Sequence, residues 1–130
     1  MASIFSKIIS GEIPCHKVAE DSNHLAFLDI SPLKHGHVLV IPKQPIDYIF
    51  DLAPEDYSAL NLFAQKVAKG IKLAVDCKKI GVVVIGLEVP HAHIHLIPIT
   101  TVSDIDFSKE KMKPTNDELK ATAELIRNNL

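Results

Sequence analysis

Three histidines alternate with apolar residues in the run His91-Ala92-His93-Ile94-His95. On an extended strand successive side chains point to opposite faces, so these histidines would project to one side at intervals of about 7 Å. A neutral imidazole is nucleophilic near pH 7, and neighbouring imidazoles can bind phosphate oxygens or assist a leaving group. The spacing therefore indicates nucleophilic attack on a phosphorus atom.

Two other interpretations of the histidine run stay open. Alternating histidines on one strand can share a zinc ion, with ligand bonds of about 2.0–2.1 Å. On a regular strand the Cα atoms of His91 and His95 would lie about 13 Å apart, so all three side chains would reach one ion with difficulty. The remaining interpretation is a solvent-facing strand that uses histidine by chance, although a chance run of this form has a probability of roughly 2%.

Composition and charge narrow the classes of partner. The chain has 130 residues, a formal net charge of -2 and a pI near 6.4. This length and an ordinary apolar content predict a single domain spanning residues 1–130. Because the net charge offers no general attraction to phosphate polymers or anionic lipid, we expect no nucleic acid and no membrane as partners.

Cysteine usage and the first residues bear on location. Cys15 and Cys77 lie far apart and form no CxxC pair, so neither a disulfide framework nor a thiolate metal site is indicated. Lys7 interrupts the first apolar residues early, and a signal peptide or membrane span is therefore not expected. We predict a reducing, cytoplasmic location.

The hydrophobic pattern of the first half predicts a short helix and three strands. Residues 3–11 favour a helix that opens on a serine cap and ends at glycine. Extended segments at 15–20 and 24–30 are expected to form a hairpin, and 37–42 a buried strand. The helix residues expected to be buried are Ile4, Phe5, Ile8 and Ile9.

The second half predicts two helices and two more strands. A long helix is expected over 54–75, with proline at its first position. The apolar runs at 80–87 and 91–99 predict buried strands that pair as antiparallel neighbours across a tight turn. A capping box at Thr115 opens a terminal helix over about 116–128.

At the histidines, the sequence resembles a known family. The run HAHIHLI at 91–97 is similar to the signature of the histidine triad (HIT) proteins. The segments IFSKIISGEIP at 4–14, LAFLDISP at 25–32 and GHVLVIPK at 36–43 resemble further segments of that family, in the same order. The resemblance covers residues 3–99.

This resemblance implies an α+β fold in which an antiparallel sheet carries the triad beside one long central helix. It also implies a homodimer whose two sheets join across a two-fold axis. The most similar branch hydrolyses purine nucleoside phosphoramidates and related adenylated compounds, so the expected ligand is a purine nucleotide or a nucleoside phosphoramidate.

Catalytic roles follow from the resemblance. His93 matches the nucleophile, which forms a covalent nucleotidyl intermediate and is oriented by a main-chain carbonyl on its other nitrogen. His91 and His95 match the flanking histidines that contact the phosphate and assist the leaving group, with packing alone as the alternative. His37 matches a histidine that supports the triad from a neighbouring strand.

Nucleotide-binding roles follow in the same way. Asp29 matches the acid that binds both ribose hydroxyls, and the alternative is an aspartate that caps the turn before Ser31. A further set of apolar residues resembles the walls that sandwich the base, although such residues are equally expected in a core. This set comprises Phe5, Ile8, Ile13, Phe27 and Ile30.

The chain also departs from the family. Many relatives carry a cysteine pair that contributes to a structural zinc, whereas Ser3 and Ser6 stand at those positions, so we expect no metal and no cofactor. The loop before the triad is shortened to VVIGLEVP, in which Val89 fits the usual phosphate-binding run and Glu88 does not. We expect Glu88 either to turn outward or to recognise a cationic amine on the leaving group.

Three functions are consistent with these residues. The leading hypothesis is hydrolysis of a nucleoside phosphoramidate in two steps through nucleotidyl-His93. The alternatives are a dinucleoside polyphosphate hydrolase and a nucleotide-binding regulatory module with weak or no catalysis, which the altered loop would favour. Isolation of a covalent nucleotide on His93 would separate the enzyme from the module.

Overall fold

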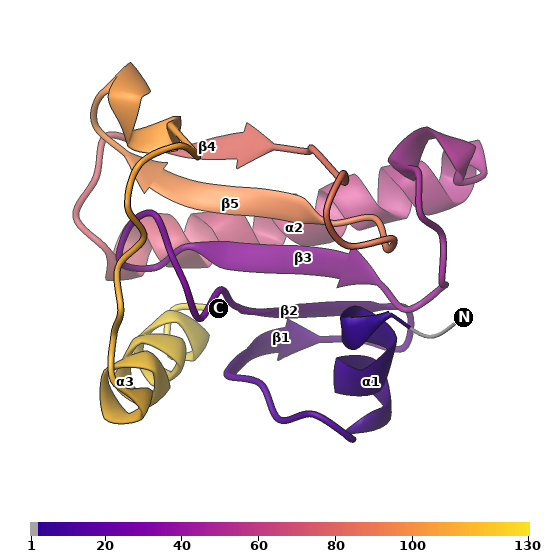
Figure 1. Cartoon of the computed structure of the whole chain (residues 1–130), viewed down its shortest axis with the longest axis horizontal. Helices are drawn as coiled ribbons and strands as arrows, with labels where there is room; N and C mark the ends of the chain where they lie inside the picture. The colour runs from indigo at the N-terminus through magenta and orange to yellow at the C-terminus, as the bar shows by residue number, and fades with distance from the viewer. Residues whose placement is uncertain (1–2) are drawn as a thin grey trace.

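The computed structural model describes residues 3–130, which form a five-stranded antiparallel sheet with helices on both faces (Figure 1). The order of strands across the sheet is β1-β2-β3-β5-β4, and every neighbouring pair is antiparallel. The predicted α+β class, the hairpin and the pairing of the last two strands are confirmed. The strands are β1 (Lys17–Glu20), β2 (His24–Leu28), β3 (Val38–Pro42), β4 (Lys79–Val83) and β5 (Ile94–Ile99).

One face of the sheet packs against α2 (Pro54–Ala74) and α3 (Asn116–Arg127). Helix α2 starts with proline, whose missing N–H costs nothing at that position, and both helices lie within a residue of their predicted bounds. Glu118 N donates to the Thr115 hydroxyl at 3.1 Å and Thr115 N donates to the Glu118 carboxylate at 2.9 Å, which confirms the capping box.

The opposite face carries α1 (Ile4–Ser10) and a second apolar cluster. Gly11 ends the helix at φ 86°, a left-handed conformation that suits glycine. Phe5 is buried as predicted, but Ile4 is 50% exposed, so its predicted burial is wrong. Ile8 and Ile9 are half-buried at the edge of this cluster. Its buried members are Phe5, Leu25, Phe27, Leu39 and Ile41.

The predicted strand at 80–87 needs two corrections. Strand β4 ends at Val83, and it is an edge strand whose Val82 is 62% exposed. An apolar run therefore does not mark burial here, because β4 has a neighbour on one side only. The connection to β5 is the long segment 84–93, not a tight turn.

Strand β5 starts later than the sequence predicts. It begins at Ile94, so His91 and His93 precede the strand. The reason lies in the backbone, since Ala92 N donates to Ile46 O at 2.6 Å instead of pairing with β3. Ala92 and Ile94 still point into the main core, as alternation predicts.

The remaining elements are the short 3-10 helices η1 (Ile49–Asp51) and η2 (Val102–Ile105). After η2 an irregular segment returns to α3 (Figure 1). No helix within residues 3–130 combines the length and apolar character that a membrane crossing requires. Both cysteines are free thiols.

Candidate active site

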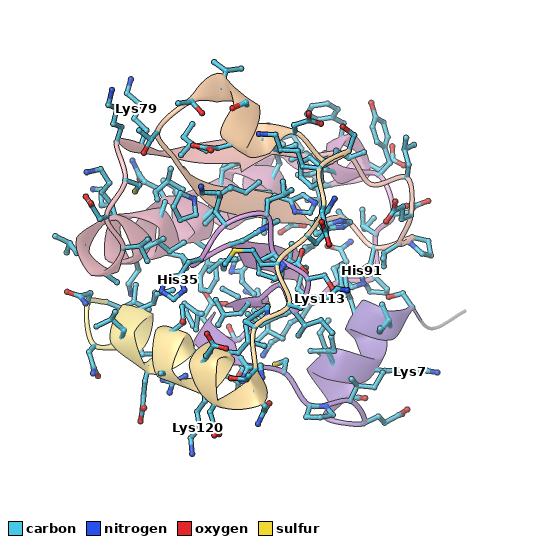
Figure 2. All side chains as sticks on the ribbon, turned by 60° about the vertical axis from the view of Figure 1, so that its left-hand side comes forward. Lys7, His35, Lys79, His91, Lys113 and Lys120 are labelled. Carbon is cyan, nitrogen blue, oxygen red and sulfur yellow. The ribbon has the colours of Figure 1, made fainter. Side chains whose placement is uncertain are left out.

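The three histidines lie close together and are buried. Their exposed fractions are 1% for His91, 7% for His93 and 8% for His95, which rules out the solvent-facing strand. His95 pairs with Leu39 of the second apolar cluster, so it belongs to the sheet face that carries α1. Figure 2 labels His91 beside the first turn of that helix.

His91 uses both ring nitrogens inside the protein. Its Nε2 donates to Pro42 O at 2.8 Å, and its Nδ1 lies 3.4 Å from the Ser3 hydroxyl, which can donate to it. Burial lowers the pKa of His91 and keeps the ring neutral. The residue therefore fastens α1 to the end of β3, and contact with a phosphate would require one of these bonds to break.

His93 presents a free lone pair to the site. Its Nδ1 donates to the main-chain carbonyl of His91 at 2.8 Å, so the neutral ring carries no proton on Nε2. Within residues 3–130 no fully buried side-chain nitrogen or oxygen lacks a partner. Because the Nε2 of His93 has no partner in the protein, it must reach solvent.

His37 and His95 form a directed chain of hydrogen bonds. Leu33 N donates to His37 Nδ1 at 3.1 Å, which places the His37 proton on Nε2. That Nε2 lies 2.9 Å from His95 Nδ1 and donates to it, so the His95 proton sits on Nε2. His93 thus offers a lone pair and His95, whose ring centroid is 5.0 Å away, offers an N–H.

Burial keeps this pair neutral. Desolvation, followed by the neighbouring His95 and Lys111, lowers the pKa of His37 to about 3. Desolvation and then the charge of His93 lower the pKa of His95 to about 4. Both rings are therefore uncharged near pH 7 in the free site.

Asp29 lies directly after β2 beside these histidines. Its Oδ1 accepts a hydrogen bond from Ser31 N at 2.9 Å, which is the turn-capping arrangement. Its Oδ2 lies 3.7 Å from His37 Nε2, and the side chain is 22% exposed. Burial raises the pKa of the Asp29 carboxyl. One carboxylate oxygen thus holds the turn while the other is accessible to a ligand.

The apolar wall residues divide between core and site. The Phe5 ring meets Phe27 at 5.6 Å within the second cluster and also meets His93 edge-on at 5.0 Å. Ile8 and Ile13 are half-buried, whereas Ile30 is 68% exposed. Phe5 is the member of this set that contacts a triad ring directly.

The shortened loop presents few polar groups. Glu88 is exposed, and its carboxylate makes no hydrogen bond or ion pair within residues 3–130. The geometry is the outward orientation expected as one of two alternatives. Val89 packs against the second cluster, and its carbonyl accepts from His91 N at 2.8 Å.

Three ligand atoms of Asp29, His37 and His95 lie within 4.8 Å of one another. The direct bond between the two rings accounts for this closeness without an ion. A metal on His37 Nε2 would displace its proton to Nδ1 and break the buried bond from Leu33 N, at a cost of about 1–3 kcal/mol. Ser3 accepts from Ser6 N at 3.1 Å as a helix cap.

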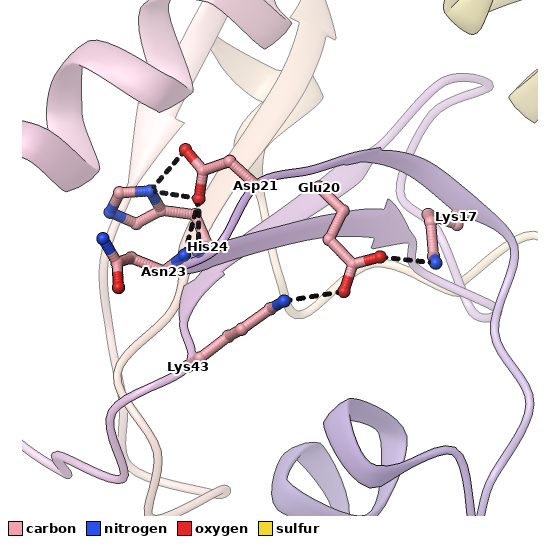
Figure 3. Close-up of polar contacts among 6 residues, drawn as sticks. All are labelled: Lys17, Glu20, Asp21, Asn23, His24 and Lys43. Carbon is pink, nitrogen blue, oxygen red and sulfur yellow. Dashed lines mark hydrogen bonds and ion pairs between the residues drawn. The ribbon is translucent and has the colours of Figure 1, made fainter.

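Other buried histidine chemistry lies away from this site. His24 Nδ1 lies 3.0 Å from each carboxylate oxygen of Asp21 at the turn between β1 and β2 (Figure 3). Its ring stacks on Phe63 of α2 at 5.0 Å. His24 therefore stabilises the hairpin and takes no part in the triad.

The structure adds one neighbour that the sequence pattern does not indicate. The Phe107 ring lies 4.9 Å from the His95 ring and 6.4 Å from that of His37. No motif or periodicity marks this residue, which comes from the irregular segment after η2. Phe107 and Phe5 thus border the histidines on two sides.

Comparisons with known proteins agree on one family. The HIT domain family matches residues 10–102 of the chain. The adenosine 5′-monophosphoramidase of Schizosaccharomyces pombe is 38% identical over 103 residues, which cover 75% of this chain and 74% of the relative. An uncharacterised HIT-like protein of Methanocaldococcus jannaschii is 44% identical over 106 residues, covering 73% and 77%. A crystal structure of a HIT-like protein involved in cell-cycle regulation from Bartonella henselae superposes with a TM-score of 0.86 at 32% identity, covering 98% and 96%.

Proposed function

Since the chain belongs to the histidine triad family, we propose that it hydrolyses nucleoside phosphoramidates or related adenylated compounds through a nucleotidyl-histidine intermediate. One observation carries the proposal. His93 donates through Nδ1 to a main-chain carbonyl, which leaves the Nε2 lone pair unprotonated and accessible. The name of the Schizosaccharomyces pombe relative, an adenosine 5′-monophosphoramidase, supports the substrate class.

The reaction proceeds in two displacements. His93 Nε2 attacks phosphorus and forms a phosphorus–nitrogen bond, while the bond to the leaving amine breaks and the amine nitrogen takes up a proton. Water then attacks phosphorus, the bond to His93 breaks and the nucleoside monophosphate is released. His95 Nε2–H is placed to donate to the phosphoryl oxygens or the leaving atom, and a bound anion favours protonation of His95.

Adenosine 5′-phosphoramidate tests this function against its two rivals. We expect release of AMP and ammonia at a rate proportional to enzyme concentration. Preferential cleavage of diadenosine polyphosphates would favour the polyphosphate hydrolase. Tight binding of AMP without turnover of either substrate would favour the regulatory module.

Asp29→Ala separates a ribose contact from a structural turn. The accessible Oδ2 supports binding of both ribose hydroxyls, so the variant should weaken AMP binding by about 1.5–3 kcal/mol. Its affinity for the 2′,3′-dideoxy analogue should change little, because those bonds are already missing. Calorimetric titration of both ligands measures the difference, and equal losses would make Asp29 a turn residue only.

We propose a homodimer that joins two sheets, as the family resemblance implies. The edge strand β4 supports it, since Val82 is 62% and Val84 is 42% exposed beside unpaired backbone groups. Light scattering at micromolar concentration should give twice the chain mass, and Val82→Lys should lower it. A monomeric wild-type protein would contradict the proposal. The two free thiols support the cytoplasmic location expected for the chain.

A further inference from the structure

Residues 106–112, called the strap below, lie along the site on the side opposite Phe5. In Figure 2 the chain between η2 and α3 descends in front of the sheet, with Lys113 labelled on it. Met112 N donates to Pro32 O at 2.9 Å, and Ser108 N donates to the Asp106 carboxylate at 2.9 Å. These bonds fix the strap to the loop that follows Asp29.

Phe107 brings the strap into contact with the triad. Its ring meets His95 at 4.9 Å with an interplanar angle of 73°. The same ring meets His37 at 6.4 Å, nearly edge-on. The strap is therefore part of the wall of the site at the end that holds the proton-donating histidine.

Lys111 is placed by this arrangement with a donor to spare. Its Nζ donates to the carbonyls of Phe107 and Lys109, the second at 3.0 Å. It lies 5.9 Å from the centre of the Phe107 ring, and the residue is half-buried. An ammonium has three N–H groups, so one remains for a ligand.

The charge of Lys111 acts on the residues of the site. Burial raises the pKa of Asp29, and the charges of His93 and Lys111 oppose that rise. The ammonium also lowers the pKa of His37, after burial and His95. Because His37 and His95 are neutral near pH 7, an ionised Asp29 would otherwise leave the site with a negative charge that repels phosphate.

We propose that Lys111 binds the phosphoryl group of the substrate, an inference that rests on the function proposed above. The strap holds this ammonium beside the ring that contacts His95, within the charge environment of Asp29. It supplies a cation where the shortened loop of residues 84–90 places exposed apolar side chains and Glu88. Lys111 is thus a binding residue that reads substrate charge, and the nucleophile stays His93.

Calorimetric titration with AMP and with adenosine tests the assignment, because only AMP carries the phosphoryl group. Lys111→Met keeps the length of the side chain and removes its charge, so AMP binding should weaken about tenfold while adenosine binding stays within about twofold. Lys111→Arg should restore AMP binding. Lys109→Met, which removes an exposed charge from the same strap, is the matched control and should behave as the wild type.

The outcomes separate the two proposals. A wild type that binds neither ligand would overturn the proposed function and this inference with it. A wild type that prefers AMP, together with an unchanged preference in Lys111→Met, would overturn the role of Lys111 alone. An equal loss for AMP and adenosine would overturn it as well, since the strap would then act on the site as a whole.

Discussion

His93→Ala should reduce the hydrolysis of adenosine 5′-phosphoramidate by several orders of magnitude and leave AMP affinity within about tenfold. The loss is large because the variant has no atom that can attack phosphorus from this position. Binding should survive, because the ribose contact at Asp29 and the charge of Lys111 are unaffected. Steady-state kinetics and calorimetric titration of the same protein preparation measure both quantities.

Controls for this prediction come from the other histidines. His35 is exposed and forms no part of the triad, so His35→Ala should retain wild-type kcat/KM. His93→Gln preserves more of the side-chain volume beside Phe5 and should be as inactive as His93→Ala. Turnover near that of the wild type in either His93 variant would refute the assigned nucleophile.

His95→Gln should lower kcat/KM about 10²–10⁴-fold for substrates whose leaving group is an alkylamine. An amine departs readily only when its nitrogen gains a proton, and the variant lacks the Nε2–H that the chain Leu33–His37–His95 orients. Substrates with a good leaving group, such as p-nitrophenolate, need little proton transfer and should lose far less. The measurement is a series of adenosine esters and amidates of graded leaving-group pKa.

The slope of that series distinguishes acid assistance from packing. If His95 assists the leaving group, the plot of log kcat/KM against leaving-group pKa should be steeper for His95→Gln than for the wild type. His37→Gln should steepen it in the same direction, because His37 holds the donor tautomer of His95. Parallel plots would make His95 a structural neighbour of Phe107.

Local signals explain which parts of the fold could be predicted from the sequence. The proline that opens α2 and the serine and threonine that cap α1 and α3 act within one helical turn, so the bounds of these helices follow from nearby residues. The wrong burial at β4 has another origin. An apolar run does not state whether a strand is central or at an edge, which depends on the order of all five strands.

The site could be predicted in part for the same reason. Alternation and family resemblance together place His93, His95 and His37 in one cluster, as the structure does. The bonds of His91 to Ser3 and Pro42 depend on where α1 and β3 pack, and the spacing of the triad carries no sign of them. Phe107 and Lys111 come from an irregular segment whose path is set by tertiary contacts, so neither follows from periodicity.

The most direct test of the central claim is mass spectrometry of the protein quenched during turnover of adenosine 5′-phosphoramidate. Quenching within milliseconds in alkaline denaturant preserves a phosphorus–nitrogen bond to histidine, which hydrolyses in acid. We predict a mass increase of one adenylyl group, which fragmentation locates on His93 and which is absent from His93→Ala. Turnover without any adduct, or an adduct on another residue such as His95, would contradict the account.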